Sequence, residues 1–218
     1  DNGSGMDAQL KDPILWTKLR KISSQLFSER SATRYGEPTC LLANSIIAVG
    51  TARGYIMTFD YHQNLTAIIG TGTKSLRCGP VTALALSDDG THLAAGHANG
   101  HIFIWELSKS SNYLIHIYPL PADKKVRVDG HIEGSQIIHL GFIGNRHSAL
   151  VSGDVHGMAF AHNATFTLLG RLVHSHKLIG RYPQELQAAT TPGDLRPTTL
   201  FALENLSHRT GDTDIGLV

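Results

Sequence analysis

The chain has 218 residues, a formal net charge of +1 at pH 7 and 41% hydrophobic residues, a composition typical of a globular protein. A charge this close to balance argues against a nucleic-acid binder, which needs a basic surface to neutralise phosphates. The sequence contains no apolar run of roughly 18 residues, so it predicts no membrane-spanning helix. Its two cysteines, Cys40 and Cys78, form no paired motif. We therefore expect a cytoplasmic, or cytosol-facing, protein with reduced thiols.

The amino-terminal part divides into two segments. Residues 1–11 have the composition of a disordered or vector-derived start. Residues 12–30 begin with an Asp-Pro pair that suits a helix N-cap and first helical position. Apolar residues then recur at helical spacing, at Leu15, Leu19, Ile22 and Leu26. We predict a short amphipathic helix, which either packs against the rest of the domain, the interpretation we favour, or contacts an anionic membrane.

Three segments within residues 36–182 share one pattern: an apolar run ending in Gly, three variable residues, a second Gly, and then alternating apolar positions. The glycine pairs are Gly50 and Gly54, Gly96 and Gly100, and Gly153 and Gly157. The first glycines of the pairs lie 46 and 57 residues apart, which fits β-propeller blades of roughly 40–45 residues with loop insertions. We therefore predict propeller blades over residues 36–182.

The middle repeat predicts a complete blade of four strands. Residues 81–86 alternate between apolar and other positions, as expected of an inner strand, and Asp89-Gly90 closes the following tight turn. Asn99-Gly100 predicts a two-residue type I′ hairpin between the second and third strands. The remaining strands are expected at residues 93–96, 101–107 and 113–118.

The repeats resemble WD40 repeats in part. Trp105-Glu106 stands at the Trp-Asp position, and Gly130-His131 precedes the third repeat as a Gly-His pair. The hairpin positions where such repeats often hold an Asp, which bonds the His of the blade, carry Arg53, Asn99 and His156. We therefore expect this polar network to be absent, and strand ladders and apolar packing to hold the blades together.

These observations predict an all-β fold: a divergent WD40-like β-propeller with a short amino-terminal amphipathic helix. A chain of this length holds at most about four or five blades, and the sequence shows three repeats. We therefore expect an incomplete portion of a larger propeller. Residues 183–199 predict a Pro-rich loop, and residues 200–218 predict the start of a further blade.

The sequence gives no support for catalysis. His174 and His176 alternate on a predicted strand and could face one side as metal ligands, but no third ligand is spaced near them. We expect His97, His101, His131 and His156 to make structural hydrogen bonds. The sequence therefore predicts a protein that is not an enzyme, with no catalytic residue, no metal site and no cofactor.

Three segments resemble one family closely: residues 16–23, residues 36–41 and, most specifically, Phe59-Asp60-Tyr61-His62-Gln63-Asn64-Leu65. Over residues 14–182 the chain is similar to the fungal form of the vacuolar protein sorting-associated protein 8 family, the specific subunits of the CORVET endosomal tethering complex. The resemblance implies a large cytosolic subunit with an amino-terminal propeller, an α-solenoid and a carboxy-terminal RING-type zinc module. This chain corresponds to part of the propeller.

The resemblance also implies a function in vesicle tethering and fusion. The expected partners are an early-endosomal Rab GTPase in its GTP form and other tethering-complex subunits, with peripheral association with the early endosome membrane. As a hypothesis of our own, the contact residues are Trp16, Tyr61, His62, Gln63 and Asn64. The alternative is a WD40-type scaffold or adaptor that binds a peptide in the central channel.

Overall fold

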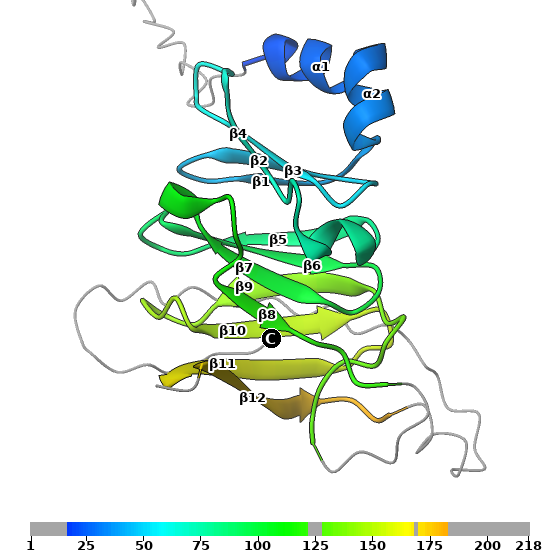
Figure 1. The fold of residues 1–218 in the computed structure, drawn as a ribbon, viewed down its shortest axis with the longest axis vertical. Coiled ribbons are helices and arrows are strands. Elements are labelled where there is room, and N and C mark those ends of the chain that lie inside the picture. Colours follow the sequence, from blue (N-terminus) through cyan, green and yellow to red (C-terminus); the bar gives the residue numbers. More distant parts are fainter. Residues whose placement is uncertain (1–16, 122–127, 168–169, 183–218) are drawn as a thin grey trace, which may run out of the picture.

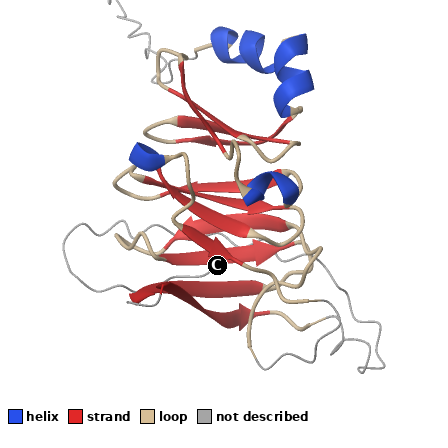
Figure 2. Cartoon of the chain, in the orientation of Figure 1, coloured by secondary structure: helices blue, strands red, loops and turns tan. Residues whose placement is uncertain are grey.

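In the computed structural model, three four-stranded antiparallel sheets stack face to face, and two short helices cover one end of the stack (Figure 1; Figure 2). The structure describes residues 17–121, 128–167 and 170–182. Each sheet is a meander in which the strands follow one another in chain order. The predicted all-β, WD40-like and incomplete propeller is confirmed. The predicted loop over 183–199 and the further blade over 200–218 lie outside the described residues.

Each repeat of the sequence forms one blade. The first blade contains β1 (Pro38–Ala43), β2 (Ile47–Thr51), β3 (Ile56–Phe59) and β4 (Leu65–Ile69). The second contains β5 (Val81–Leu86), β6 (His92–His97), β7 (Ile102–Glu106) and β8 (Ile115–Ile117). The third contains β9 (Ile137–Phe142), β10 (Ala149–Asp154), β11 (Ala159–Thr167) and β12 (Gly170–Ile179). A 3₁₀ turn, η1 (Lys74–Arg77), connects the first blade to the second, and another, η2 (Leu107–Lys109), connects β7 to β8 within the second blade.

The first glycine of the first and second repeats allows neighbouring sheets to approach closely. A Cβ at Gly50 would lie 2.7 Å from Cγ1 of Val81, on the inner strand of the second blade. A Cβ at Gly96 would likewise overlap Ile137, on the inner strand of the third blade. Only a residue without a side chain fits at these two positions.

The second glycine of each repeat makes the hairpin turn. Gly54, Gly100 and Gly157 have φ values of 82°, 87° and 75°, a conformation that favours glycine. The predicted type I′ turn at Asn99-Gly100 is wrong, because Asn99 does not have the positive φ that this turn requires. The N–H of Gly100 instead bonds the carbonyl of His97, and the turn spans three residues with the left-handed glycine last.

Two apolar layers lie between the three sheets. The layer between the first and second blades includes Ile56, Val81, Leu93, Phe103 and Trp105, all essentially buried. The layer between the second and third blades includes Ile102, Ile104, Ile137 and Leu150. Each large side chain buried in this way contributes about 1.5–3 kcal/mol, so these layers are the main force between blades.

A third apolar layer places the helices on the first blade. The single helix predicted within residues 12–30 is two helices in the described part, α1 (Arg20–Leu26) and α2 (Glu29–Tyr35). The break occurs because the Ser28 hydroxyl accepts a hydrogen bond from the N–H of Ser31 and starts the second helix. Ile22 and Leu26 are buried against the face of the first sheet that points away from the second blade (Figure 1).

The third blade contains a buried polar network, so its predicted absence is wrong for this blade. Nδ1 of His131 lies 2.8 Å from the Asp154 carboxylate, and Nε2 of His131 lies 2.6 Å from the Ser152 hydroxyl. That hydroxyl also lies 2.6 Å from His162, whose other ring nitrogen lies 2.7 Å from Ser175. Asp154 directly follows Gly153, the first glycine of the repeat, whereas the sequence prediction placed the acidic residue two positions later, where His156 stands.

Candidate protein-interaction site

The turn between β3 and β4, residues 60–64, is held in one shape by its own side chains. The Asp60 carboxylate accepts hydrogen bonds from the Asn64 backbone N–H at 2.8 Å and from the Asn64 side-chain amide at 3.0 Å. These bonds lower the pKa of Asp60, so the carboxylate is ionised at neutral pH. Gln63 has a φ of 65°, the only positive φ at a non-glycine residue in the described part of the chain. The hydrogen bonds between Asp60 and Asn64 therefore hold the backbone of this turn in one conformation.

Gln63 joins this turn to α1. Its side-chain carbonyl accepts a hydrogen bond from the N–H of Lys21 at 3.1 Å, and its amide donates to the carbonyl of Lys18 at 3.1 Å. The Lys21 ammonium returns a hydrogen bond to the carbonyl of His62 at 3.2 Å. Since the N–H groups in the first turn of a helix have no partner within the helix, the Gln63 side chain caps α1. The turn and the helix thus form one surface.

The predicted contact residues have different positions in this surface. Tyr61 is 69% exposed, and its hydroxyl donates a hydrogen bond to the carbonyl of Asn44 in the β1–β2 turn. His62 and Asn64 are also exposed. Gln63 is half-buried and directed at α1, so it positions the surface rather than presenting a free side chain. Trp16 lies outside the described residues.

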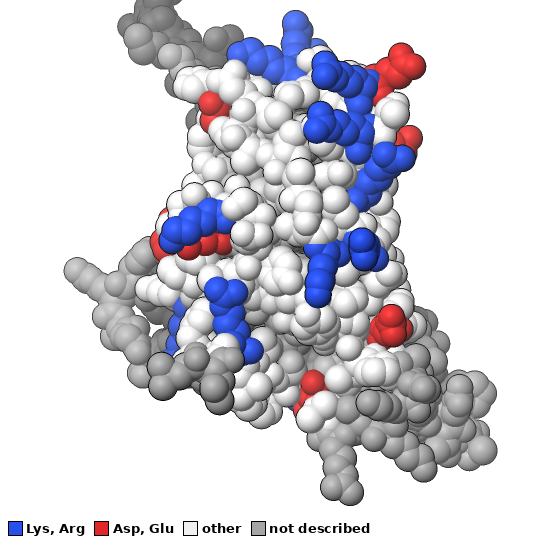
Figure 3. Space-filling view, in the orientation of Figure 1, with Lys and Arg blue, Asp and Glu red and all other residues white. Residues whose placement is uncertain are grey.

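The two helices also carry an exposed apolar side chain and several cations. Phe27, at the junction of α1 and α2, is 70% exposed. Figure 3 shows that Lys and Arg side chains gather at the end of the molecule formed by the helices. The exposed cations of the two helices are Arg20, Lys21, Arg30 and Arg34.

Phe27 was not identified from the sequence, because this residue lies outside the apolar stripe that marked the helix. No helix in the described residues is long and apolar enough to cross a membrane.

The two histidines that the sequence singled out on a strand lie as predicted. His174 and His176 are on one face of β12 and are both exposed. A separate group of three ligand-bearing side chains comes from two blades: Asp89, His92 and His147, with one atom of each within 4.8 Å of the others. Sequence spacing could not reveal this group, since Asp89 and His147 are 58 residues apart.

Three antiparallel meanders, stacked through glycine-mediated contacts, define part of a β-propeller. In this class, loops and blade rims carry the binding sites. The sequence matches the Vps8 beta-propeller family over residues 12–215, and the chain belongs to this family.

Individual relatives are similar over much of the chain. The vacuolar protein sorting-associated protein 8 of Saccharomyces cerevisiae is 30% identical over 182 residues, which are 76% of this chain and 14% of that protein. The Mus musculus homolog is 32% identical over 124 residues, 57% of this chain and 8% of that protein. The chain thus spans a small part of these relatives. The solved β-propeller domain of Myceliophteria thermophila Cps50 (Swd1) is 12% identical with a TM-score of 0.49, covering 69% of this chain and 42% of that one.

Proposed function

We propose that this chain is part of a non-catalytic interaction propeller in an endosomal vesicle-tethering complex. It binds an early-endosomal Rab GTPase in its GTP form and other subunits of the complex, and so promotes endosome tethering and fusion from the cytoplasmic face of the membrane. The observation that carries the proposal is the match to the Vps8 beta-propeller family over residues 12–215. The relatives are named as vacuolar protein sorting-associated proteins.

The surface formed by the turn 60–64 and α1 supports a protein partner. Tyr61 presents a large aromatic side chain on a turn whose shape is fixed by Asp60 and Gln63. Preorganised aromatic residues of this kind commonly dominate the energy of interfaces. The γ-phosphate orders the switch regions of a GTPase, so a rigid surface that contacts these regions discriminates between the two nucleotide states.

The proposal is tested by measuring binding of the full-length protein to a panel of endosomal Rab GTPases. Each GTPase is loaded with a non-hydrolysable GTP analogue or with GDP. We expect binding to one early-endosomal Rab, at least about tenfold tighter in the GTP form. Equal binding in both nucleotide states, or no binding to any member, would contradict the proposal.

A pair of tyrosines maps the surface. Tyr61→Ala removes the exposed aromatic ring of the turn, while Tyr118→Ala removes a ring that is 61% exposed beyond β8 of the second blade. We expect the first variant to weaken Rab binding about tenfold or more, equivalent to about 1.4 kcal/mol, and the second to bind as the wild type does. Unchanged binding by Tyr61→Ala would exclude this surface and favour a peptide site in the central channel.

A further inference from the structure

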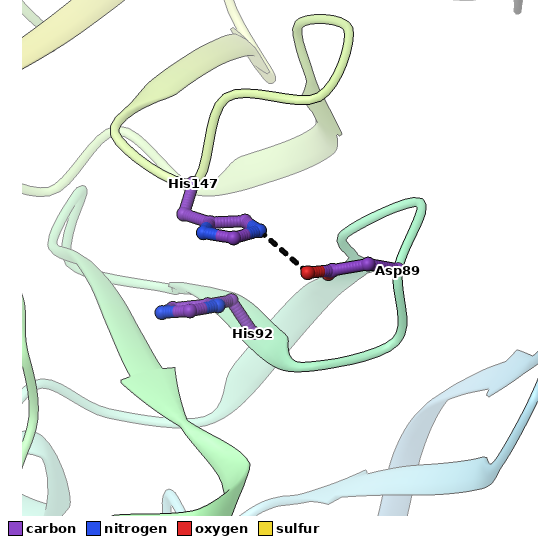
Figure 4. Close-up of side chains that lie close together, drawn as sticks. All are labelled: Asp89, His92 and His147. Carbon is purple, nitrogen blue, oxygen red and sulfur yellow. Dashed lines mark hydrogen bonds and ion pairs between the residues drawn. The ribbon is translucent and has the colours of Figure 1, made fainter.

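Asp89, His92 and His147 form a cluster across the junction of the second and third blades (Figure 4). Asp89 belongs to the β5–β6 turn, His92 begins β6, and His147 belongs to the β9–β10 turn. Nε2 of His147 lies 2.8 Å from a carboxylate oxygen of Asp89. The rings of His92 and His147 are stacked, with centroids 4.0 Å apart and an interplanar angle of 14°.

Neighbouring side chains hold the Asp89 carboxylate in place. Ser87 donates a hydrogen bond to it at 2.7 Å, and Thr91 donates from its N–H at 3.1 Å and from its hydroxyl at 2.8 Å. These bonds, led by that of Ser87, hold the pKa of Asp89 well below its usual range. Such support around a ligand fixes its orientation, as it does in metal sites.

The position of His92 also suits a metal ligand. The residue is only 9% exposed at the start of β6, and its ring stacks on that of His147, so its orientation is restricted. Each of the three residues brings one ligand atom within 4.8 Å of the others.

We propose that Asp89, His92 and His147 bind one Zn²⁺ ion, which links the second blade to the third. Two imidazole nitrogens and one carboxylate oxygen suit Zn²⁺, whereas Mg²⁺ and Ca²⁺ prefer oxygen ligands alone. Beside the cluster lies an open hollow of about 310 Å³, which His92, Leu114, His147, Ser148 and Phe166 line. It leaves room for water to complete the coordination.

Binding requires at least one of the stacked rings to turn, because nitrogen lone pairs lie in the ring plane and two nearly parallel rings do not aim at one point. Ligands about 2.0–2.2 Å from a tetrahedral ion lie about 3.3–3.6 Å from one another, while the three ligand atoms now lie within 4.8 Å. The hydrogen bond between His147 and Asp89 gives way to a metal bond from each residue. The side chains of His147 and Asp89 are 40% and 46% exposed, so both can shift without disturbing the core.

Two variants and one control test the site in the full-length protein by calorimetric titration with Zn²⁺. His147→Ala removes one ligand, and Asp89→Asn keeps an acceptor for the His147 hydrogen bond while removing the anionic ligand. The control replaces His174 and His176 with Ala, which removes two exposed histidines from β12 of the third blade. Comparing variants with the wild type isolates this site from any metal bound elsewhere in the protein.

We expect the wild type to bind one more Zn²⁺ than His147→Ala does, with a micromolar Kd. Asp89→Asn should weaken this site at least about tenfold, and the His174/His176 control should bind as the wild type does. Zn²⁺ should also slow amide exchange in residues 87–92 and 144–148 of the wild type and leave His147→Ala unaffected. Identical titrations of the wild type and His147→Ala, or loss of the site in the control alone, would overturn the proposal.

Discussion

His131 and Asp154 form a buried pair in which Nδ1 of the imidazole donates to the carboxylate at 2.8 Å, with both side chains at most 2% exposed. Burial lowers the pKa of His162 to about 3, so this ring is neutral and has one donor and one acceptor. Since the neutral ring of His162 has one donor and one acceptor, the Ser152 and Ser175 hydroxyls play opposite roles toward its two nitrogens. The network runs from Ser175 through His162 and Ser152 to His131 and ends at Asp154.

The first prediction concerns Ser152, the centre of this network. Ser152→Ala leaves the facing ring nitrogens of His131 and His162 without their partner in a buried place. Each unsatisfied buried group costs about 1–3 kcal/mol, so with two such groups we expect the third blade to lose about 2–6 kcal/mol of stability. Amide exchange of β10 and β11 in the full-length protein measures the loss. Thr165→Ala, an exposed hydroxyl on β11, serves as the control, and an equal effect of the two variants would contradict the network.

The second prediction is that stability falls with pH below about 6.5. Burial lowers the pKa of His97 to about 4, and that of His162 to about 3. The unfolded chain takes up these protons near pH 6.5, whereas the folded chain does so only near pH 3–4. The contribution of these residues is therefore fully present above pH 6.5 and is lost as the pH falls, by about 2 kcal/mol per residue at pH 5.

Chemical unfolding at pH 7.5, 6.5 and 5.0 measures this dependence. His97→Gln removes one of the two groups and should flatten the profile, while His174→Ala, an exposed residue, should leave it unchanged. If His97→Gln and the wild type lose stability in parallel, His97 does not carry the effect.

The third prediction concerns the contact between blades at Gly96. Gly96→Ala places a methyl group against the Ile137 side chain on β9, and overpacking of this kind costs about 1–3 kcal/mol. Gly130→Ala is the milder control, since its Cβ would approach Cγ of Leu120 no closer than 3.2 Å, whereas a Cβ at Gly96 would lie 2.4 Å from Cγ2 of Ile137. Unfolding of the two variants should separate them clearly. A fully stable Gly96→Ala protein would show that the sheets can move apart without cost.

The fourth prediction concerns Gln63, which joins the turn to α1. Gln63→Ala removes the side-chain bonds to Lys18 and Lys21, so we expect faster amide exchange at the start of α1. Rab affinity should fall about three- to tenfold through loss of preorganisation, while Tyr61 stays exposed. Ser24→Ala, which removes a hydroxyl bonded only to the Lys21 carbonyl within α1, is the matched control. Unchanged amide exchange at the start of α1 in Gln63→Ala would show that the Gln63 side chain does not stabilise this helix.

The sequence predicted the features that depend on local pattern. The alternation of residues 81–86 gave the bounds of β5, and the glycine pairs located the three blades. Features that depend on chain folding were missed. Gln63 lies 42 residues from Lys21, and nothing in either segment indicates the other.

Some local features were missed because two patterns competed. The apolar stripe predicted one helix, but Ser28 caps a second one and leaves Phe27 exposed at the break. The acidic residue of the third-blade network was missed because it lies at Asp154, directly after the glycine. The equivalent positions in the other blades hold Thr51 and His97, so the repeats do not mark this position as acidic.

The most direct test of the account is a hydrogen–deuterium exchange footprint of the full-length protein with a GTP-analogue-loaded early-endosomal Rab. We expect slower exchange in residues 17–27 and 60–64 with the GTP-analogue-loaded Rab, and no such change with the GDP-loaded Rab. Protection confined to the inner strands β1, β5 and β9, or equal protection in both nucleotide states, would contradict it.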